Sequence, residues 1–205
     1  MVAAKTVLRY IKGSDHLGLK YAAPGELVGY SDADFASDVD SRLSTTGYVI
    51  IYNGEAIGWV SKIQPTVAVS ITETEYVAGA MVAKDAIWLR RLLGALTGTT
   101  KPVQMRCVNQ GALALMHHAD SSPCTKHIDT THHFIREKVA EKQILMAHVP
   151  TGKMTEDALS KLLAVPAFTT GVAAMGLYLT LQTAHAGECW DAGATALCSP
   201  RGLGT

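Results

Sequence analysis

Residues 27–60 read LVGYSDADFASDVDSRLSTTGYVIIYNGEAIGWV, and this stretch decides the fold. It holds three extended runs rich in β-branched and aromatic residues, LVGYSD, TTGYVIIY and AIGWVS. The dipeptide Asn53-Gly54 separates the last two runs. Such a pair is typical of a two-residue hairpin turn, because Asn and Gly tolerate the positive φ angles that the turn requires. The stretch therefore predicts three consecutive antiparallel strands.

A helical pattern follows the three predicted strands. From Thr72 to Leu96, apolar residues recur mainly at intervals of three, four or seven, which predicts one long amphipathic helix. The rest of the chain predicts, in order, a strand at 103–108, a helix at 109–117, a helix at 132–142, a strand at 144–149 and a helix at about 155–163. This order of elements predicts an α/β fold with a mixed sheet covered by helices.

The composition limits the function classes. The chain has 205 residues, 48% of them hydrophobic, which is enough to bury a core. Its 18 basic and 18 acidic side chains balance, so there is no global attraction to nucleic acid and any such contact must be local. The four cysteines lie far apart without a C-x-x-C pair, so neither a disulfide framework nor a thiolate zinc site is indicated. With no apolar signal segment in MVAAKTVLRYIKG, we expect an intracellular location, in the cytoplasm or nucleus, and no secretion.

The two ends of the chain differ from its middle. Residues 1–22 predict a short basic helix and then a brief strand around Leu17 to Tyr21. Residues 162–184 carry no formal charge, and a run of this length is sufficient to span a bilayer, which is the alternative for this segment. The Pro, Gly and Thr residues within that run favour a packed or disordered tail over a span. We therefore expect three parts: residues 1–22, a domain at 23–163, and a divergent, loosely packed or disordered tail at 164–205.

Seven segments of the chain, taken together and in order, resemble the ribonuclease H domain at the end of copia-type retrotransposon polyproteins. They are AAKTVLRYIKG, LVGYSDADFASDVDSRLSTTGYV, AIGWVSKIQPTVAVSITETEYVAGA, AIWLRRLL, CVNQGALAL, TKHIDTTHHFIREKV and VPTGKMTEDALSK, within residues 3–163. The resemblance implies a ribonuclease H-like three-layer fold, with a five-stranded mixed sheet and helices on both faces. It also implies that residues 1–22 are the end of the reverse transcriptase connection region. The reverse transcriptase portion of the same polyprotein is then the expected partner.

The resemblance implies a chemistry as well. Ribonuclease H enzymes hydrolyse the RNA strand of RNA–DNA hybrids with two divalent ions, Mg²⁺ or alternatively Mn²⁺, held by carboxylates. The family positions of the first, second and fourth carboxylates fall on Asp32, Glu75 and Asp157, which we expect to be catalytic and metal-binding.

Each of these three carboxylates has an alternative structural role. Asp32 lies in an acidic cluster with Asp34, the weaker candidate, and the cluster could be a solvated loop. Glu75 could close a capping box with Thr72, unless Ser70 and Glu73 cap the helix instead. Asp157 could serve only to stabilise the first turn of a helix.

The third carboxylate of the family pattern is absent. Where the family motif reads C-D-N-Q, this chain reads Cys107-Val108-Asn109-Gln110, and the side chain of Val108 cannot bind magnesium. We therefore expect the family fold with weak or no hydrolysis and doubtful metal binding. The alternative is a non-enzymatic, nucleic-acid-binding remnant of the fold.

Seven further residues are expected to contact the hybrid backbone, by resemblance and by residue type. They are Arg42, Ser44, Thr45, Asn109, Gln110, Lys126 and Arg136. The three histidines of TKHIDTTHHF lack the helical i, i+4 spacing and the cysteine pair of a zinc site. We expect no zinc there.

Overall fold

The structure, a computed structural model, describes residues 2–21, 25–98, 100–117, 129–150 and 157–179. Helix α1, Val2–Ser14, belongs to a first unit. Its apolar residues Val7, Leu8 and Ile11 are all more than half exposed. Residues 17–179 form the second unit, which holds all the other described elements.

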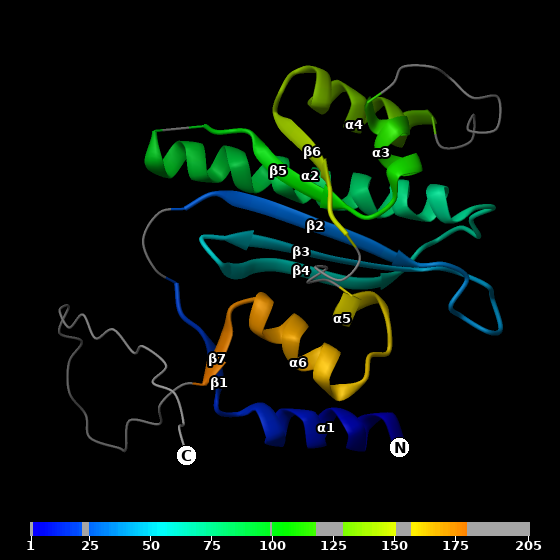
Figure 1. Ribbon diagram of the computed structural model, residues 1–205, viewed down its shortest axis with the longest axis vertical. Coiled ribbons are helices and arrows are strands. Elements are labelled where there is room, and N and C mark those ends of the chain that lie inside the picture. Colours follow the sequence, from blue (N-terminus) through cyan, green and yellow to red (C-terminus); the bar gives the residue numbers. More distant parts are fainter. Residues whose placement is uncertain (1, 22–24, 99, 118–128, 151–156, 180–205) are drawn as a thin grey trace, which may run out of the picture. The chain divides into compact units, whose positions relative to one another are not determined.

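A five-stranded mixed sheet forms the centre of the second unit (Figure 1). Its strands are β2 (Leu27–Asp34), β3 (Thr45–Tyr52), β4 (Glu55–Ile63), β5 (Val103–Cys107) and β6 (Ile144–His148). They lie in the order β4-β3-β2-β5-β6, so β2 is central. The pairs β2–β3 and β3–β4 are antiparallel, whereas β2–β5 and β5–β6 are parallel. This sheet confirms the predicted antiparallel meander, with the two later strands on the other side of its first strand.

The turn between β3 and β4 has the predicted conformation. Asn53 has a φ of 56° and Gly54 a φ of 96°, and the flanking residues Tyr52 and Glu55 are paired across the two strands. Two successive positive φ angles match the right-handed twist of a hairpin. The local sequence therefore fixes the register in which β3 and β4 begin to pair.

Helices cover both faces of the sheet (Figure 1). One face carries α2 (Ile71–Thr97), α3 (Gln110–His117) and α4 (Asp129–Ala140), and the other carries α5 (Asp157–Ser160) and α6 (Val165–Ala174). The larger core lies on the α2 face and includes the fully buried Tyr76, Val82, Met105, Met116 and Ile135. A smaller core on the α5 face contains Val49, Ile51, Ala56 and Met175. The expected α/β class with a three-layer arrangement is confirmed.

The structure differs from the sequence-based expectation after residue 156. The helix expected at about 155–163 is observed only at Asp157–Ser160, with residues 151–156 outside the described part. Within the expected tail, α6 forms and Met175 is buried, and β7 (Leu177–Leu179) pairs antiparallel with β1 (Leu17–Leu19). The cause is compositional: α6 has no charged residue, so it shows no polar face that would reveal a helix.

In the described residues, no helix is both long enough and apolar enough to cross a membrane.

Candidate active site

Asp32 lies on the central strand and points to the α5 face of the sheet. Its side chain is 2% exposed, and across the β2–β3 ladder it pairs with Gly47. Ser160 at the end of α5 donates its hydroxyl to Oδ2 of Asp32. The acidic cluster is therefore not simply a solvated loop, because Asp32 is a buried, hydrogen-bonded carboxylate. Asp34, the weaker candidate, lies half-buried at the end of the same strand.

Glu75 enters the site from the first turns of α2. The helix begins at Ile71 with Ser70 as its N-cap, whose Oγ accepts the backbone N–H of Glu73 at 3.1 Å. The Glu73 carboxylate in turn accepts the backbone N–H of Val69 at 2.8 Å. Ser70 and Glu73 thus cap the helix, and Glu75 is not needed for this role.

Glu75 is buried beside Asp32 and holds its proton more tightly than a free glutamate. Burial first, and then the negative charge of Asp32, raise the pKa of Glu75 to about 8. The backbone N–H of Ala33 and the charge of Lys161 act in the opposite direction without cancelling the rise. At neutral pH Glu75 is therefore mostly protonated.

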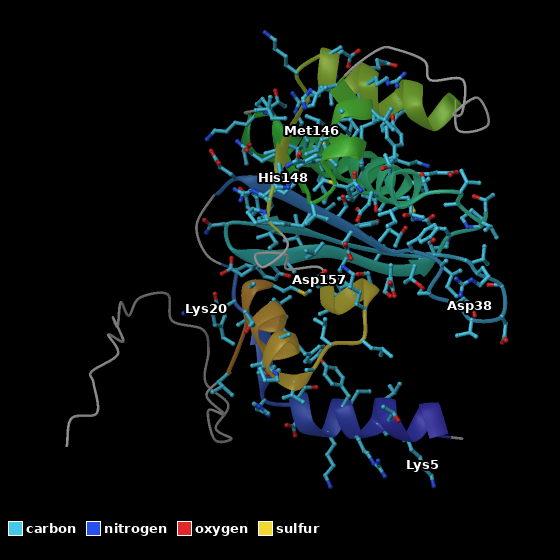
Figure 2. All side chains as sticks on the ribbon, turned by 45° about the vertical axis from the view of Figure 1, so that its right-hand side comes forward. Lys5, Lys20, Asp38, Met146, His148 and Asp157 are labelled. Carbon is cyan, nitrogen blue, oxygen red and sulfur yellow. The ribbon has the colours of Figure 1, made fainter. Side chains whose placement is uncertain are left out.

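Lys161 contacts both Asp157 and Asp32. The Nζ atom of Lys161 lies 2.9 Å from Oδ2 of Asp32 and 2.8 Å from Oδ1 of Asp157. Figure 2 shows Asp157 at α5, beside the sheet. Burial lowers the pKa of Lys161, but the contacts with Asp157 and Asp32 outweigh it and leave the pKa above its ordinary value. Lys161 is therefore a cation held between two carboxylates.

Val108 follows the last residue of β5. In the parallel β2–β5 ladder, Ser31 pairs with Cys107, so the next residues along the two strands are Asp32 and Val108. The Val108 side chain is half-buried. The position at which the family pattern carries its third carboxylate thus lies next to Asp32, and it is apolar in this chain.

The residues present do not fit a pair of magnesium ions. Among the described residues, no group of three or more His, Cys, Asp or Glu side chains is placed to hold a metal ion. Oδ2 of Asp32 already accepts the Ser160 hydroxyl and contacts the Lys161 ammonium group. Mg²⁺ prefers several oxygen ligands in near-octahedral geometry. The site lacks one carboxylate and contains a lysine instead.

The residues expected to contact substrate fall into different groups in the structure. Arg42 and Gln110 are exposed. Ser44 is fully buried, and its hydroxyl accepts the N–H of Ala36. Thr45 is half-buried and bonds to Ser37.

The two remaining described candidates have structural partners. Asn109 Oδ1 accepts the N–H of Ala112, so it caps α3. Arg136 Nε donates to the Leu115 carbonyl at 2.8 Å and joins α4 to α3. Lys126 and the side chains of His127, His132 and His133 lie outside the described part of the chain.

Sequence reasoning missed two residues of this site, Ser160 and Lys161. The four-residue spacing from Asp157 to Lys161 is a signal for an ion pair along a helix. Nothing in the local sequence indicates that either residue reaches Asp32, because Ser160 is 128 positions away along the chain.

Comparisons with known proteins find similarity to retrotransposon Pol polyproteins and to solved ribonuclease H domains. The Pol polyprotein of transposon TNT 1-94 from Nicotiana tabacum is 38% identical over 160 residues, which cover 78% of this chain and 12% of that protein. The Pol polyprotein of transposon RE1 from Arabidopsis thaliana is 35% identical over 178 residues, covering 85% of this chain and 12% of that protein. A solved N-terminal ribonuclease H domain of rv2228c from Mycobacterium tuberculosis has a TM-score of 0.49 and 14% identity, over 73% of this chain and 98% of that one. No protein-family model matches the chain.

The strand order and the helices on both faces define a ribonuclease H-like domain. The chain is homologous to the copia-type Pol polyproteins of plant transposons. It spans 12% of the length of these polyproteins.

Proposed function

We propose that this chain is the ribonuclease H-like domain of a retrotransposon Pol polyprotein, that it binds RNA–DNA hybrids, and that its hydrolytic activity is weak or absent. The homology to Pol polyproteins and the fold support the domain assignment. The reverse transcriptase portion of the same polyprotein is the proposed partner. Mg²⁺ is the proposed ion of active relatives, and its binding here is proposed to be weak.

The observation that carries the proposal is the position of Val108, which directly follows Cys107 just as Asp32 follows its ladder partner Ser31. Catalysis with two metal ions requires ligands whose negative charge holds the ions close together. An isopropyl group supplies neither charge nor an oxygen atom. Asp32, Glu75 and Asp157 remain. However, burial beside Asp32 raises the pKa of Glu75 and keeps it mostly protonated at neutral pH, and Asp157 is paired with Lys161.

A second candidate function is hybrid binding without any cleavage. It is favoured by the misfit of the site to metal ions together with two exposed polar side chains, Arg42 between β2 and β3 and Gln110 at the start of α3. Contacts to phosphate need only such groups and no catalytic geometry. Hybrid binding without cleavage therefore requires the fold and its surface groups but no bound metal ions.

A cleavage assay tests the role of Val108 in the missing activity. The parent, Val108→Asp and Val108→Asn are incubated with a labelled RNA–DNA hybrid in Mg²⁺ and, separately, in Mn²⁺. We expect little product from the parent and from Val108→Asn, and clear cleavage by Val108→Asp, because the Asn variant matches the Asp variant in shape but lacks its charge. Cleavage by the parent as fast as by Val108→Asp would refute the role of Val108.

Binding is measured separately by fluorescence anisotropy. We expect the parent to bind hybrid with an affinity that falls as salt increases, since phosphate contacts release counterions. Replacing the exposed Arg42 by Ala should weaken the binding and reduce the salt dependence. Absence of hybrid binding at low salt would contradict both functions.

A further inference from the structure

The site contains a cation of its own. The Lys161 ammonium group lies 2.9 Å from Asp32 and 2.8 Å from Asp157, so the carboxylates of the two acids can be no more than about 6 Å apart. The side chain of Asp32 is 2% exposed, that of Asp157 is 20% exposed and that of Lys161 is 33% exposed. Two acids on different elements are therefore held together by one shared lysine.

The backbone fixes the position from which this lysine reaches the acids. The Lys161 N–H donates to the Asp157 carbonyl at 2.9 Å, which continues the helical turn of α5. The preceding residue, Ser160, donates its hydroxyl to the same Asp32 oxygen that Lys161 contacts. The end of α5 thus directs one hydroxyl and one ammonium group at Asp32.

A buried carboxylate needs a counter-charge, because an unpaired charge in a protein interior is strongly destabilising. In most metal sites the ion supplies that charge. Here Lys161 supplies it to Asp32 and to Asp157 at once. A divalent cation bound between these acids would have to approach the ammonium group or displace it.

We propose that Lys161 is a built-in counter-ion that takes the place of a divalent cation between Asp32 and Asp157 and opposes metal binding there. The inference deepens the proposed function, since it adds a second cause of weak activity to the missing carboxylate at Val108. Its test uses no nucleic acid. Failure of hybrid binding or of cleavage therefore leaves this test unaffected, and the reverse also holds.

The test compares Mg²⁺ binding by the parent, Lys161→Met and Lys161→Arg, each as the full chain. Lys138→Met is the matched control, because Lys138 also contacts two carboxylates, Glu137 at 2.5 Å and Glu141 at 3.0 Å. Calorimetric titration with MgCl₂ gives the affinity. Thermal unfolding in Mg²⁺, against NaCl of equal ionic strength, gives the stabilisation by the bound ion.

We expect Lys161→Met to bind Mg²⁺ at least about tenfold more tightly than the parent, because the positive charge of Lys161 disfavours a second cation at this distance. Its melting temperature should be below that of the parent without Mg²⁺ and should rise specifically with Mg²⁺. The parent, Lys161→Arg and Lys138→Met should show no such rise.

Equal Mg²⁺ affinity of Lys161→Met and the parent would overturn the proposal, as would micromolar Mg²⁺ binding by the parent itself. Should Lys161→Met not fold, Lys161→Gln is used in its place, because the amide removes the charge but still donates a hydrogen bond to a carboxylate. Unchanged Mg²⁺ affinity in Lys161→Gln would overturn the proposal equally.

Discussion

Gly47 is the residue that allows α5 to reach Asp32, and replacing it by Ala tests this directly. Gly47 lies opposite Asp32 in the β2–β3 ladder. A Cβ atom at this position would be 2.8 Å from the backbone N of Ser160, 2.9 Å from its Cβ and 3.0 Å from the carbonyl carbon of Leu159. These are mainly backbone atoms, so a side-chain rotation cannot relieve the clash, and α5 must move away from the sheet.

The size of the effect follows from three contributions. Overpacking of this kind costs about 1–3 kcal/mol. Weakening the bond from Ser160 to the charged Asp32 adds on the order of 1 kcal/mol. The lower entropy of the unfolded Ala chain offsets about 0.5 kcal/mol. We therefore expect Gly47→Ala to lose about 1.5–3.5 kcal/mol of unfolding free energy, which corresponds to a fall in melting temperature of about 3–14 °C.

Urea denaturation of the parent, Gly47→Ala and Gly58→Ala measures this loss. Gly58 is the matched control, because it lies in the neighbouring strand β4 and an added Cβ would meet nothing closer than Ile50 at 3.9 Å. Gly58→Ala should lie within about 0.5 kcal/mol of the parent. The reasoning is refuted if Gly47→Ala is as stable as the parent, or if the two Ala variants lose the same stability.

Two further predictions concern the protonation of Glu75 and the packing of Met175. The pKa of Glu75 is raised from 4.5 to about 8 in the folded protein, so the folded chain keeps a proton that the unfolded chain releases between these pH values. The contribution of Glu75 to the free energy of unfolding is therefore complete below pH 4.5 and is lost as the pH rises to 8. Between pH 5 and pH 8.5, the free energy of unfolding of the parent, measured in urea, should fall by on the order of 3 kcal/mol more than that of Glu75→Gln. Parallel pH profiles of the two proteins would contradict this prediction. Met175→Ala should lose about 2 kcal/mol, since Met175 is 7% exposed in the smaller core, and an unchanged urea midpoint would show that the α6 segment is not packed on the sheet.

The local elements of this fold are predictable because their causes are local. The alternating residues of 27–60 and the Asn53-Gly54 turn determine which strands pair first. The spacing of apolar residues after Ser70 determines the long helix α2, and the Ser70–Glu73 cap determines where that helix begins. Each signal acts within a few residues along the chain, so sequence alone can reveal it.

The composition of the carboxylate set was also readable from the sequence. Asp32, Glu75 and Asp157 occupy family positions, and Val108 stands where the family pattern has its third carboxylate. The structure adds where these side chains lie. It places Asp32 and Val108 one residue beyond the last pair of the β2–β5 ladder, and it buries Glu75 beside Asp32.

Only the tertiary structure decided what surrounds Asp32. Ser160 and Lys161 reach it because Gly47 leaves space for the end of α5 against the sheet. In the same way, β7 pairs with β1, which lies at the opposite end of the described chain. Such contacts join segments more than a hundred residues apart, and they depend on how side chains pack once the chain has closed on itself. The sequence by itself therefore determined the strands, the long helix and the missing acid, whereas packing determined that Lys161 pairs with Asp32 and Asp157.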